Sequence, residues 1–190
     1  MDSETFSVGT AADFAIDPDA NPTKTLSQAY TTFKKLLLDA CDKDYNQLIA
    51  SDYSLIALRD NYSFYIGDCC TAQSLTTLLY LGIDIVVNCT DDTKLDNLFE
   101  SQGIEYTQPL GVSDRPESDE ILRQRLIDTK LLEYLFDSIV SGKRVLIHCH
   151  AGISRSVTVA ICLMMQHFAF NFNEAYDHVQ HYRPCIFVKK

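Results

Sequence analysis

Short apolar runs alternate with segments of helical periodicity through most of this 190-residue chain, and this alternation limits the folds it can adopt. Residues 83–87 and 145–148 are dense in aliphatic and β-branched residues, which is typical of strands buried on both faces. Two further short strands are predicted over 63–66 and 104–108. Amphipathic segments lie between and after these runs, the last of them over 173–182. The pattern predicts an α/β fold with a mostly parallel central sheet flanked by helices.

Capping residues and glycines mark where the predicted helices begin and end. Asp68 can cap a helix that ends near Gly82, and Gly142 follows a long helix predicted over 118–140. The last buried strand leads directly into a helix that begins near Arg155. Ligands bind beyond the carboxyl ends of the strands in such sheets, so the sequence predicts a functional site between that strand and that helix.

Three regions are expected along the chain. Residues 1–24 have few aliphatic side chains and are predicted to form a loosely ordered leader. Residues 25–52 carry apolar residues at helical spacing and are expected to form a helical extension. Residues 53–190 hold the alternating strands and helices and form the main domain.

Composition argues against some classes of function. The net charge is −10, which disfavours broad nucleic-acid binding and docking on anionic membranes, because both need a basic face. The first 19 residues lack the apolar segment of a secretory signal. The seven cysteines form no CxxC pair, which indicates reduced thiols. We therefore expect a cytoplasmic protein, with the nucleus as an alternative location.

The segment that joins the last strand to its helix is the strongest functional motif. Residues 148–156 read His-Cys-His-Ala-Gly-Ile-Ser-Arg-Ser, which has the pattern HCxxGxxRS. A loop that enters a helix can point several backbone N–H groups at an anion, and the helix dipole adds positive potential. Gly152 allows a tight turn, and Arg155 offers a planar fork for two phosphoryl oxygens. The motif predicts a cradle for a phosphate dianion.

Cys149 stands at the base of this predicted cradle. An ordinary cysteine is only a few per cent thiolate at neutral pH, but helix N-termini and neighbouring cations lower its pKa. Ser156 can donate a hydrogen bond that stabilises the thiolate and later helps it to leave. The sequence therefore predicts that Cys149 is a nucleophile towards phosphorus.

These residues resemble a known family. The run 148–156 resembles the signature of protein tyrosine phosphatases, and its second half is most similar to dual-specificity phosphatases of the MAP-kinase phosphatase type. Tyr-Ile-Gly-Asp at 65–68, Ala72 and residues 81–88 are similar to the opening of that catalytic domain. The resemblance implies that 53–190 is a dual-specificity phosphatase catalytic domain with a protein-tyrosine-phosphatase-like fold.

The resemblance also implies an activity. It implies hydrolysis of phosphotyrosine and phosphothreonine or phosphoserine through a phosphocysteine intermediate, without a metal or a cofactor. The partner would be a phosphoprotein, with a kinase as a candidate. Cys149, Arg155 and Ser156 would be catalytic. The phosphate would be bound by His150, Ala151, Gly152, Ile153, Ser154 and Arg155.

A carboxylic acid should protonate the leaving oxygen, and two aspartates precede the loop. Asp114 lies in an irregular stretch after the third predicted strand, where the resembled family places its acid. Asp119 lies where the long helix begins and can be explained as a favourable first-turn charge. We expect Asp114 to be the acid.

Three further residues are candidates for supporting roles. In the resembled fold an Asn at the position of Asn88 braces the phosphate loop, although an ordinary strand-end turn residue is an equal interpretation. His148 is expected to be a buried histidine that fixes the loop geometry. Cys89 should lie at the same end of the sheet as Cys149 and is a candidate redox partner, with a simple buried cysteine as the alternative.

Other functions remain open at this point. A phosphoinositide phosphatase would favour lysines within the phosphate loop, and this loop has none. The acidic composition disfavours an RNA 5′-phosphatase. A non-catalytic phosphoprotein-binding module usually loses the Cys or the Arg of the motif, and this sequence keeps both.

Overall fold

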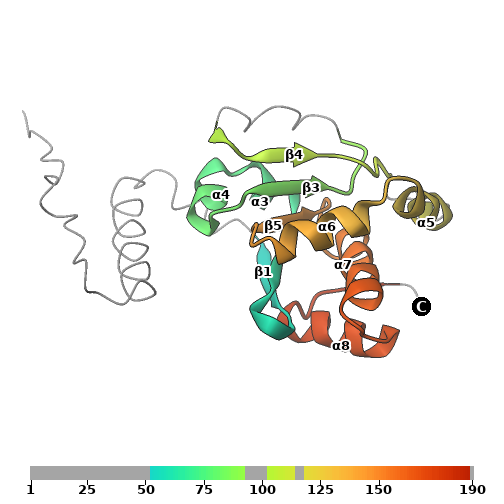
Figure 1. Ribbon diagram of the computed structural model, residues 1–190. Coiled ribbons are helices and arrows are strands. Elements are labelled where there is room, and N and C mark those ends of the chain that lie inside the picture. The colour runs from blue at the N-terminus through green and yellow to red at the C-terminus, as the bar shows by residue number, and fades with distance from the viewer. Residues whose placement is uncertain (1–51, 93–101, 114–117, 189–190) are drawn as a thin grey trace, which may run out of the picture. The chain divides into compact units, whose positions relative to one another are not determined.

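The computed structural model describes residues 52–92, 102–113 and 118–188 (Figure 1). Its sheet has five strands in the order β1-β2-β5-β3-β4. The strands are β1 (Tyr53–Ala57), β2 (Ser63–Gly67), β3 (Ile85–Asn88), β4 (Glu105–Thr107) and β5 (Val145–His148). β5 runs parallel to both of its neighbours, and β4 is parallel to β3. The predicted α/β class with a mostly parallel sheet is confirmed.

β1 is a strand that the sequence pattern does not predict. It lies at one edge of the sheet, and it pairs antiparallel with β2 across the short 3-10 turn η2 (Arg59–Asn61). Its sequence, Tyr-Ser-Leu-Ile-Ala, has neither a dense apolar run nor a clean alternation of apolar and polar residues. In the structure, only Ile56 of this strand is fully buried.

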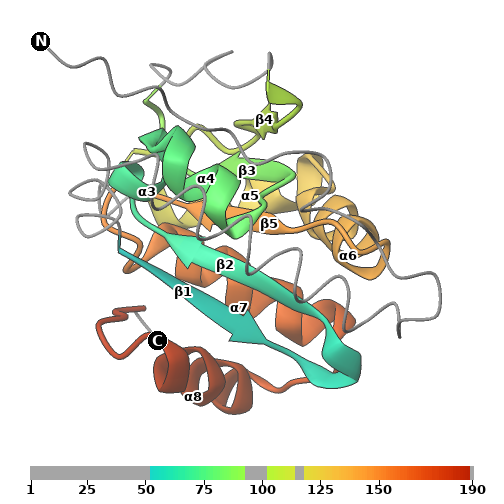
Figure 2. The same ribbon diagram turned by 90° about the vertical axis from the view of Figure 1, so that its left-hand side faces the viewer.

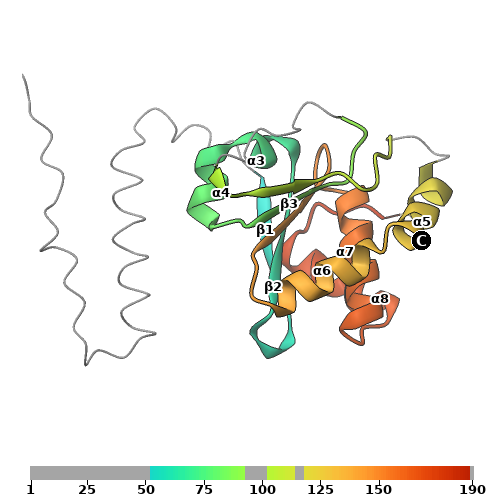
Figure 3. The same ribbon diagram turned by 45° about the horizontal axis from the view of Figure 1, so that its top comes forward.

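Helices cover both faces of the sheet (Figures 1 and 3). The side chains of Val86 and Leu146 pack with the residues of α3 (Cys69–Gln73) and α4 (Leu75–Leu81) on one face. Their neighbours along the same strands point to the opposite face and form the larger core, as the alternation of a strand requires. That core receives the four helices α5 (Ser118–Asp128), α6 (Leu131–Val140), α7 (Arg155–His167) and α8 (Phe172–Tyr182).

Two helices that the sequence predicts as continuous are each divided. The helix expected between Asp68 and Gly82 is divided into α3 and α4, because Ser74 leaves the helical region and caps α4 through a hydrogen bond from the Thr77 N–H. The helix expected over 118–140 is divided at Lys130, which has a positive φ of 51°. The predicted ends are confirmed, since Asp68 accepts from the Thr71 N–H at 2.8 Å and Gly82 closes α4 with φ 63°.

α7 and α8 pack on each other and on the strands of the larger core. α7 lies along β5 and β2, and Figure 2 shows α8 beside β1 and α7. Asn171 caps α8 in a reciprocal capping box with Glu174, two residues before the predicted start. Within the described ranges no helix is long and apolar enough to cross a membrane. The predicted leader and helical extension lie outside the described residues, apart from Asp52.

Candidate active site

The predicted phosphate loop lies between β5 and α7, at the carboxyl end of the most central strand of the sheet. β5 is flanked by two parallel neighbours, and all four of its residues are buried. The strand therefore holds the start of the loop rigidly, and α7 holds its end. This is the position that the sequence predicts for a ligand site.

Cys149 is almost fully buried at the base of the loop, with 2% of its surface exposed. The Gly152 N–H lies 3.2 Å from its Sγ, and the Ser156 hydroxyl lies 3.4 Å from it, so both donate to the sulfur. Burial by itself would raise the pKa of this thiol. The hydrogen bonds from Ser156 and Gly152 and the positive charge of Arg155 outweigh burial, and the pKa lies below its ordinary value. At a given pH, Cys149 is therefore more often a thiolate than an ordinary cysteine is.

Arg155 and Gly152 are both closely surrounded by residues from other segments. Arg155 is buried, and its Nη1 donates to the Val112 carbonyl at 2.8 Å. Gly152 has a φ of 65°, which is in the left-handed region. A Cβ at this position would lie only 2.7 Å from the Gly67 carbonyl oxygen and from a guanidinium nitrogen of Arg183. Only glycine fits here without a shift of the surrounding backbone.

The two histidines beside Cys149 have different surroundings. His148 is 1% exposed, its Nδ1 lies 3.2 Å from the Cys149 carbonyl oxygen, and its buried Nε2 has no hydrogen-bond partner among the described residues. Burial lowers the pKa of His148 to about 4, so its ring is neutral at pH 7. His150 is exposed on the loop. His148 is thus the buried histidine that the sequence predicts.

Asn88 shapes the turn after β3. Its side-chain amide donates to the Asp92 carbonyl at 2.9 Å and to the Tyr106 hydroxyl at 2.8 Å, and its oxygen accepts from the Thr90 N–H at 2.8 Å. These partners correspond to the strand-end turn interpretation of Asn88. None of these three bonds goes to the phosphate loop.

Cys89 lies directly behind the phosphate loop. It is fully buried, and its N–H donates to the His148 carbonyl at 2.9 Å. Burial and the neighbouring Cys149 sulfur raise its pKa well above the ordinary value. Cys89 is therefore a protonated thiol at neutral pH, close enough to Cys149 to be influenced by its charge.

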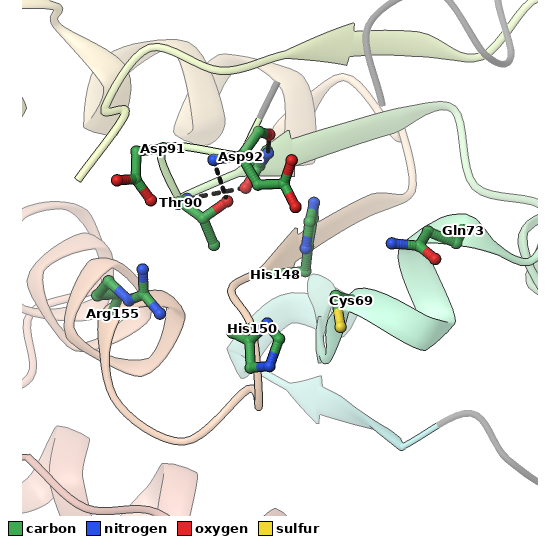
Figure 4. A pocket seen from close by; sticks show the side chains of 9 residues that line it. Cys69, Gln73, Thr90, Asp91, Asp92, His148, His150 and Arg155 are labelled. Atoms are coloured by element: carbon green, nitrogen blue, oxygen red, sulfur yellow. Dashed lines mark hydrogen bonds between the residues drawn. The ribbon is translucent and has the colours of Figure 1, made fainter. Parts of the chain in front are cut away.

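A cavity of about 370 Å³ opens beside the loop (Figure 4). Figure 4 shows Arg155 on one side of it, Cys69 and Gln73 on the opposite side, and Asp91 and Asp92 along the turn after β3. His150 reaches the cavity from the loop. The lining residues are Cys69, Gln73, Asn88, Thr90, Asp91, Asp92, His148, His150 and Arg155.

The predicted general acid lies outside the described residues, because 114–117 are not described. Asp114 directly follows Ser113, and Val112, which accepts from Arg155, lies two residues before it. Asp119 lies within the first turn of α5. The choice between the two aspartates therefore stays a prediction.

Sequence patterns miss several residues of the site. Asp91 and Asp92 have the sequence context of a helix start, and the structure places both along the cavity. Cys69 has no motif around it, and it also lines the cavity. Arg183, which no motif singles out, is buried against the loop and pairs with Asp52. Local patterns give no sign of these contacts, because each joins distant segments. Within the described ranges, no group of three or more His, Cys, Asp or Glu side chains could hold a metal ion.

Comparisons with known proteins agree with this geometry. Residues 64–190 match the family model described as "Dual specificity phosphatase, catalytic domain". Human dual specificity protein phosphatase 9 is 32% identical over 124 residues, which cover 65% of this chain and 31% of that protein. Protein phosphatase Slingshot of Drosophila melanogaster is 30% identical over 132 residues, which cover 64% of this chain and 11% of that protein. The chain therefore belongs to the dual specificity phosphatase catalytic-domain family.

Solved structures share the fold. The human tyrosine phosphatase-like serine/threonine/tyrosine-interacting protein has a TM-score of 0.55 and 26% identity, over 66% of this chain and 83% of that chain. Human DUSP28 has a TM-score of 0.56 over 66% of this chain and 80% of its own, and its 21% identity supports the fold alone. The match spans a third or less of the length of the first two curated relatives.

Proposed function

We propose that this chain is a protein phosphatase that hydrolyses phosphotyrosine and phosphothreonine or phosphoserine through a phosphocysteine intermediate. The environment of Cys149 carries the proposal: a buried sulfur that accepts from Gly152 and Ser156, with its pKa lowered beside Arg155. This combination stabilises a thiolate where a phosphoryl group can be held. The substrate is a phosphoprotein, and a kinase is a candidate.

In the first step, the Cys149 thiolate attacks phosphorus while the bond from phosphorus to the leaving oxygen breaks. Asp114 gives its proton to that oxygen, so the protein product leaves as a neutral alcohol or phenol. Arg155 and the loop N–H groups hold the remaining phosphoryl oxygens as their charge shifts.

In the second step, water attacks the phosphocysteine and the bond between phosphorus and sulfur breaks. The Asp114 carboxylate takes a proton from that water, and inorganic phosphate is released. The hydrogen bond from Ser156 stabilises Cys149 as it leaves as a thiolate.

The charge around the cavity favours a protein substrate over a polyphosphorylated lipid or an RNA end. Asp91 and Asp92 line the cavity next to Arg155, and they repel phosphates beyond the one in the cradle. The net charge of −10 acts in the same direction.

The test is the hydrolysis of phenyl phosphate and of p-nitrophenyl phosphate from pH 5 to 8, with a chelator present. We expect turnover that Cys149→Ser abolishes. Asp114→Asn should lower the rate with phenyl phosphate by about 10²–10⁴-fold, the usual contribution of a general acid. The loss should be smaller with p-nitrophenyl phosphate, because nitrophenolate leaves without a proton.

Asp119→Asn is the matched control, since it removes the same charge from the other candidate acid. If Asp119→Asn reproduces the loss and Asp114→Asn does not, the assignment of the acid is wrong. Turnover that survives Cys149→Ser would refute the phosphocysteine mechanism. A folded wild-type chain that binds a phosphotyrosine peptide without hydrolysing it would instead be a binding module.

A further inference from the structure

Arg183 directly follows α8, and its side chain reaches the outer side of the phosphate loop. It is 1% exposed. Its Nε donates to the Gly152 carbonyl at 2.6 Å, and its Nη2 lies 3.3 Å from the Ala151 carbonyl. Its remaining partners are Asp52, at 2.7 Å and 3.0 Å to the two carboxylate oxygens, and the Ser54 hydroxyl, at 3.4 Å. One guanidinium therefore joins α8, the start of β1 and the loop.

The carbonyl oxygens of four consecutive loop residues accept hydrogen bonds from outside the loop. The pairs are His150 with the Cys69 N–H, Ala151 and Gly152 with Arg183, and Ile153 with the Phe187 N–H. Arg183 thus accounts for half of this outer set. All four peptide units are held by their carbonyl ends.

The C=O and N–H of a trans peptide unit point in opposite directions. The Ala151 carbonyl and the Gly152 N–H belong to one unit, and that N–H donates to Cys149 at 3.2 Å. Arg183 and Cys149 therefore lie at opposite ends of the same peptide dipole. In the next unit, Arg183 holds the Gly152 carbonyl, so the Ile153 N–H points away from Arg183.

We propose that Arg183 is a positioning residue for the reaction, which aims the peptide N–H groups of the phosphate loop at the Cys149 sulfur and at the bound phosphoryl group. The effect of Arg183 on the loop is argued from the geometry above. Its effect on the reaction rests on the proposed function. The positive charge at the carbonyl end also polarises each peptide unit, which strengthens its N–H as a donor.

Asp52 fixes the orientation of the Arg183 guanidinium. The planar guanidinium binds a carboxylate in a two-pronged geometry, which fixes the plane of Arg183 and leaves Nε aimed at Gly152. A lysine could keep the positive charge, but it could not satisfy the carboxylate fork and two carbonyls together. The geometry of Arg183 is therefore required in addition to its charge.

The experiment is the alkylation of Cys149 by iodoacetamide as a function of pH, with Arg183→Lys beside the wild type. We expect the midpoint of the alkylation profile to rise by about half a pH unit to one unit, the size of one weakened hydrogen bond to the sulfur. Inorganic phosphate should protect against alkylation only at about tenfold higher concentration, because the N–H groups also bind phosphate. In phenyl phosphate hydrolysis, kcat should fall more than KM rises.

Arg144→Lys is the matched control. Arg144 also donates from its guanidinium to a backbone carbonyl, that of Leu81, at the opposite end of β5. It should leave the alkylation midpoint and phosphate protection unchanged. Asp52→Asn is the second variant, for the case that Arg183→Lys does not fold, since the Asp52 side chain is 59% exposed. It should shift the midpoint in the same direction by a smaller amount.

A folded Arg183→Lys variant that loses thermal stability but keeps the wild-type midpoint, phosphate protection and kcat would overturn the inference and leave Arg183 as a structural residue. An unchanged midpoint in Asp52→Asn, with Arg183→Lys unfolded, would overturn it as well. Failure of the proposed function gives a different result. In that case neither the wild type nor any variant hydrolyses a phosphate ester, while the alkylation midpoints still report the effect of Arg183 on the Cys149 thiol.

Discussion

At the scale of single residues, Gly152 has little freedom to change. Its φ of 65° strains any side chain, and a Cβ there would lie 2.7 Å from the Gly67 carbonyl oxygen. We predict that Gly152→Ala destabilises the fold by about 1–3 kcal/mol, the usual cost of overpacking a tight site. It should also lower kcat strongly, because the Gly152 N–H would move away from Cys149. Chemical denaturation and phenyl phosphate hydrolysis measure both effects.

Gly142→Ala separates strain from overpacking. Gly142 has a φ of 87°, and no atom lies within 4 Å of the point that a Cβ would occupy, so its replacement tests the backbone conformation alone. It should cost less stability than Gly152→Ala and leave kcat unchanged. Equal losses at the two positions would contradict the packing argument.

Cys89 stays a predicted redox partner. Hydrogen peroxide would oxidise the Cys149 thiolate to a sulfenic acid as its O–O bond breaks and hydroxide leaves; the Cys89 thiol would then displace water to form a disulfide. The burial of Cys89 and its raised pKa predict that the second step is slow. We predict that a thiol reductant restores activity to the peroxide-treated wild type but not to Cys89→Ser, in which Cys149 oxidises further.

Cys162→Ser is the control for this prediction, because Cys162 is a partly buried cysteine whose pKa is raised by burial alone. It should recover activity as the wild type does. Equal recovery by Cys89→Ser would leave Cys89 as a buried core thiol.

At the scale of elements, a capping box stabilises the start of α8, the helix that Arg183 directly follows. Asn171 accepts from the Glu174 N–H at 3.0 Å, and the Glu174 carboxylate accepts from the Asn171 N–H at 2.8 Å. We predict that Asn171→Ala lowers the free energy of unfolding by about 1 kcal/mol, as the loss of a good N-cap does. Thermal or urea denaturation measures this change.

Asn173→Ala is the matched substitution inside the first turn of α8. It removes the same side chain from an exposed position without a capping role, so its effect should be near zero or slightly stabilising. If both variants lose the same stability, the cap does not contribute as the geometry indicates.

Element boundaries show where sequence patterns are informative. The caps at Asp68 and Gly82 depend on contacts within one turn, so their residue types predict them. The breaks at Ser74 and Lys130 escape prediction, because the apolar periodicity continues through both positions. Whether α6 continues the line of α5 or turns to pack on β5 is decided by the core beneath it.

At the scale of the whole molecule, charge should select among substrates. Asp91 and Asp92 line the cavity of a chain that already carries a net charge of −10. We predict that the double variant Asp91→Asn, Asp92→Asn raises kcat/KM for a peptide with two nearby phosphates by about fivefold relative to the singly phosphorylated peptide, the factor for about 1 kcal/mol of relieved repulsion. Added salt should reduce this difference.

The double variant Asp137→Asn, Asp177→Asn removes the same charge from exposed positions on α6 and α8. It should leave the preference between the two peptides unchanged. An equal gain in this variant would mean that net charge, and not the cavity, sets the preference.

Local sequence patterns are sufficient to predict the sheet-forming runs, the class of fold and the phosphate loop. They suffice because these features depend on neighbours in the chain: a buried strand, a glycine with positive φ and a helix N-terminus follow one another within residues 145–156. The surroundings of the loop depend on the tertiary structure. Arg183 lies 31 residues from Gly152 and 131 from Asp52, and the aspartates of the cavity come from the turn after another strand. A contact between distant segments depends on how the whole sheet and its helices pack, which no local pattern encodes.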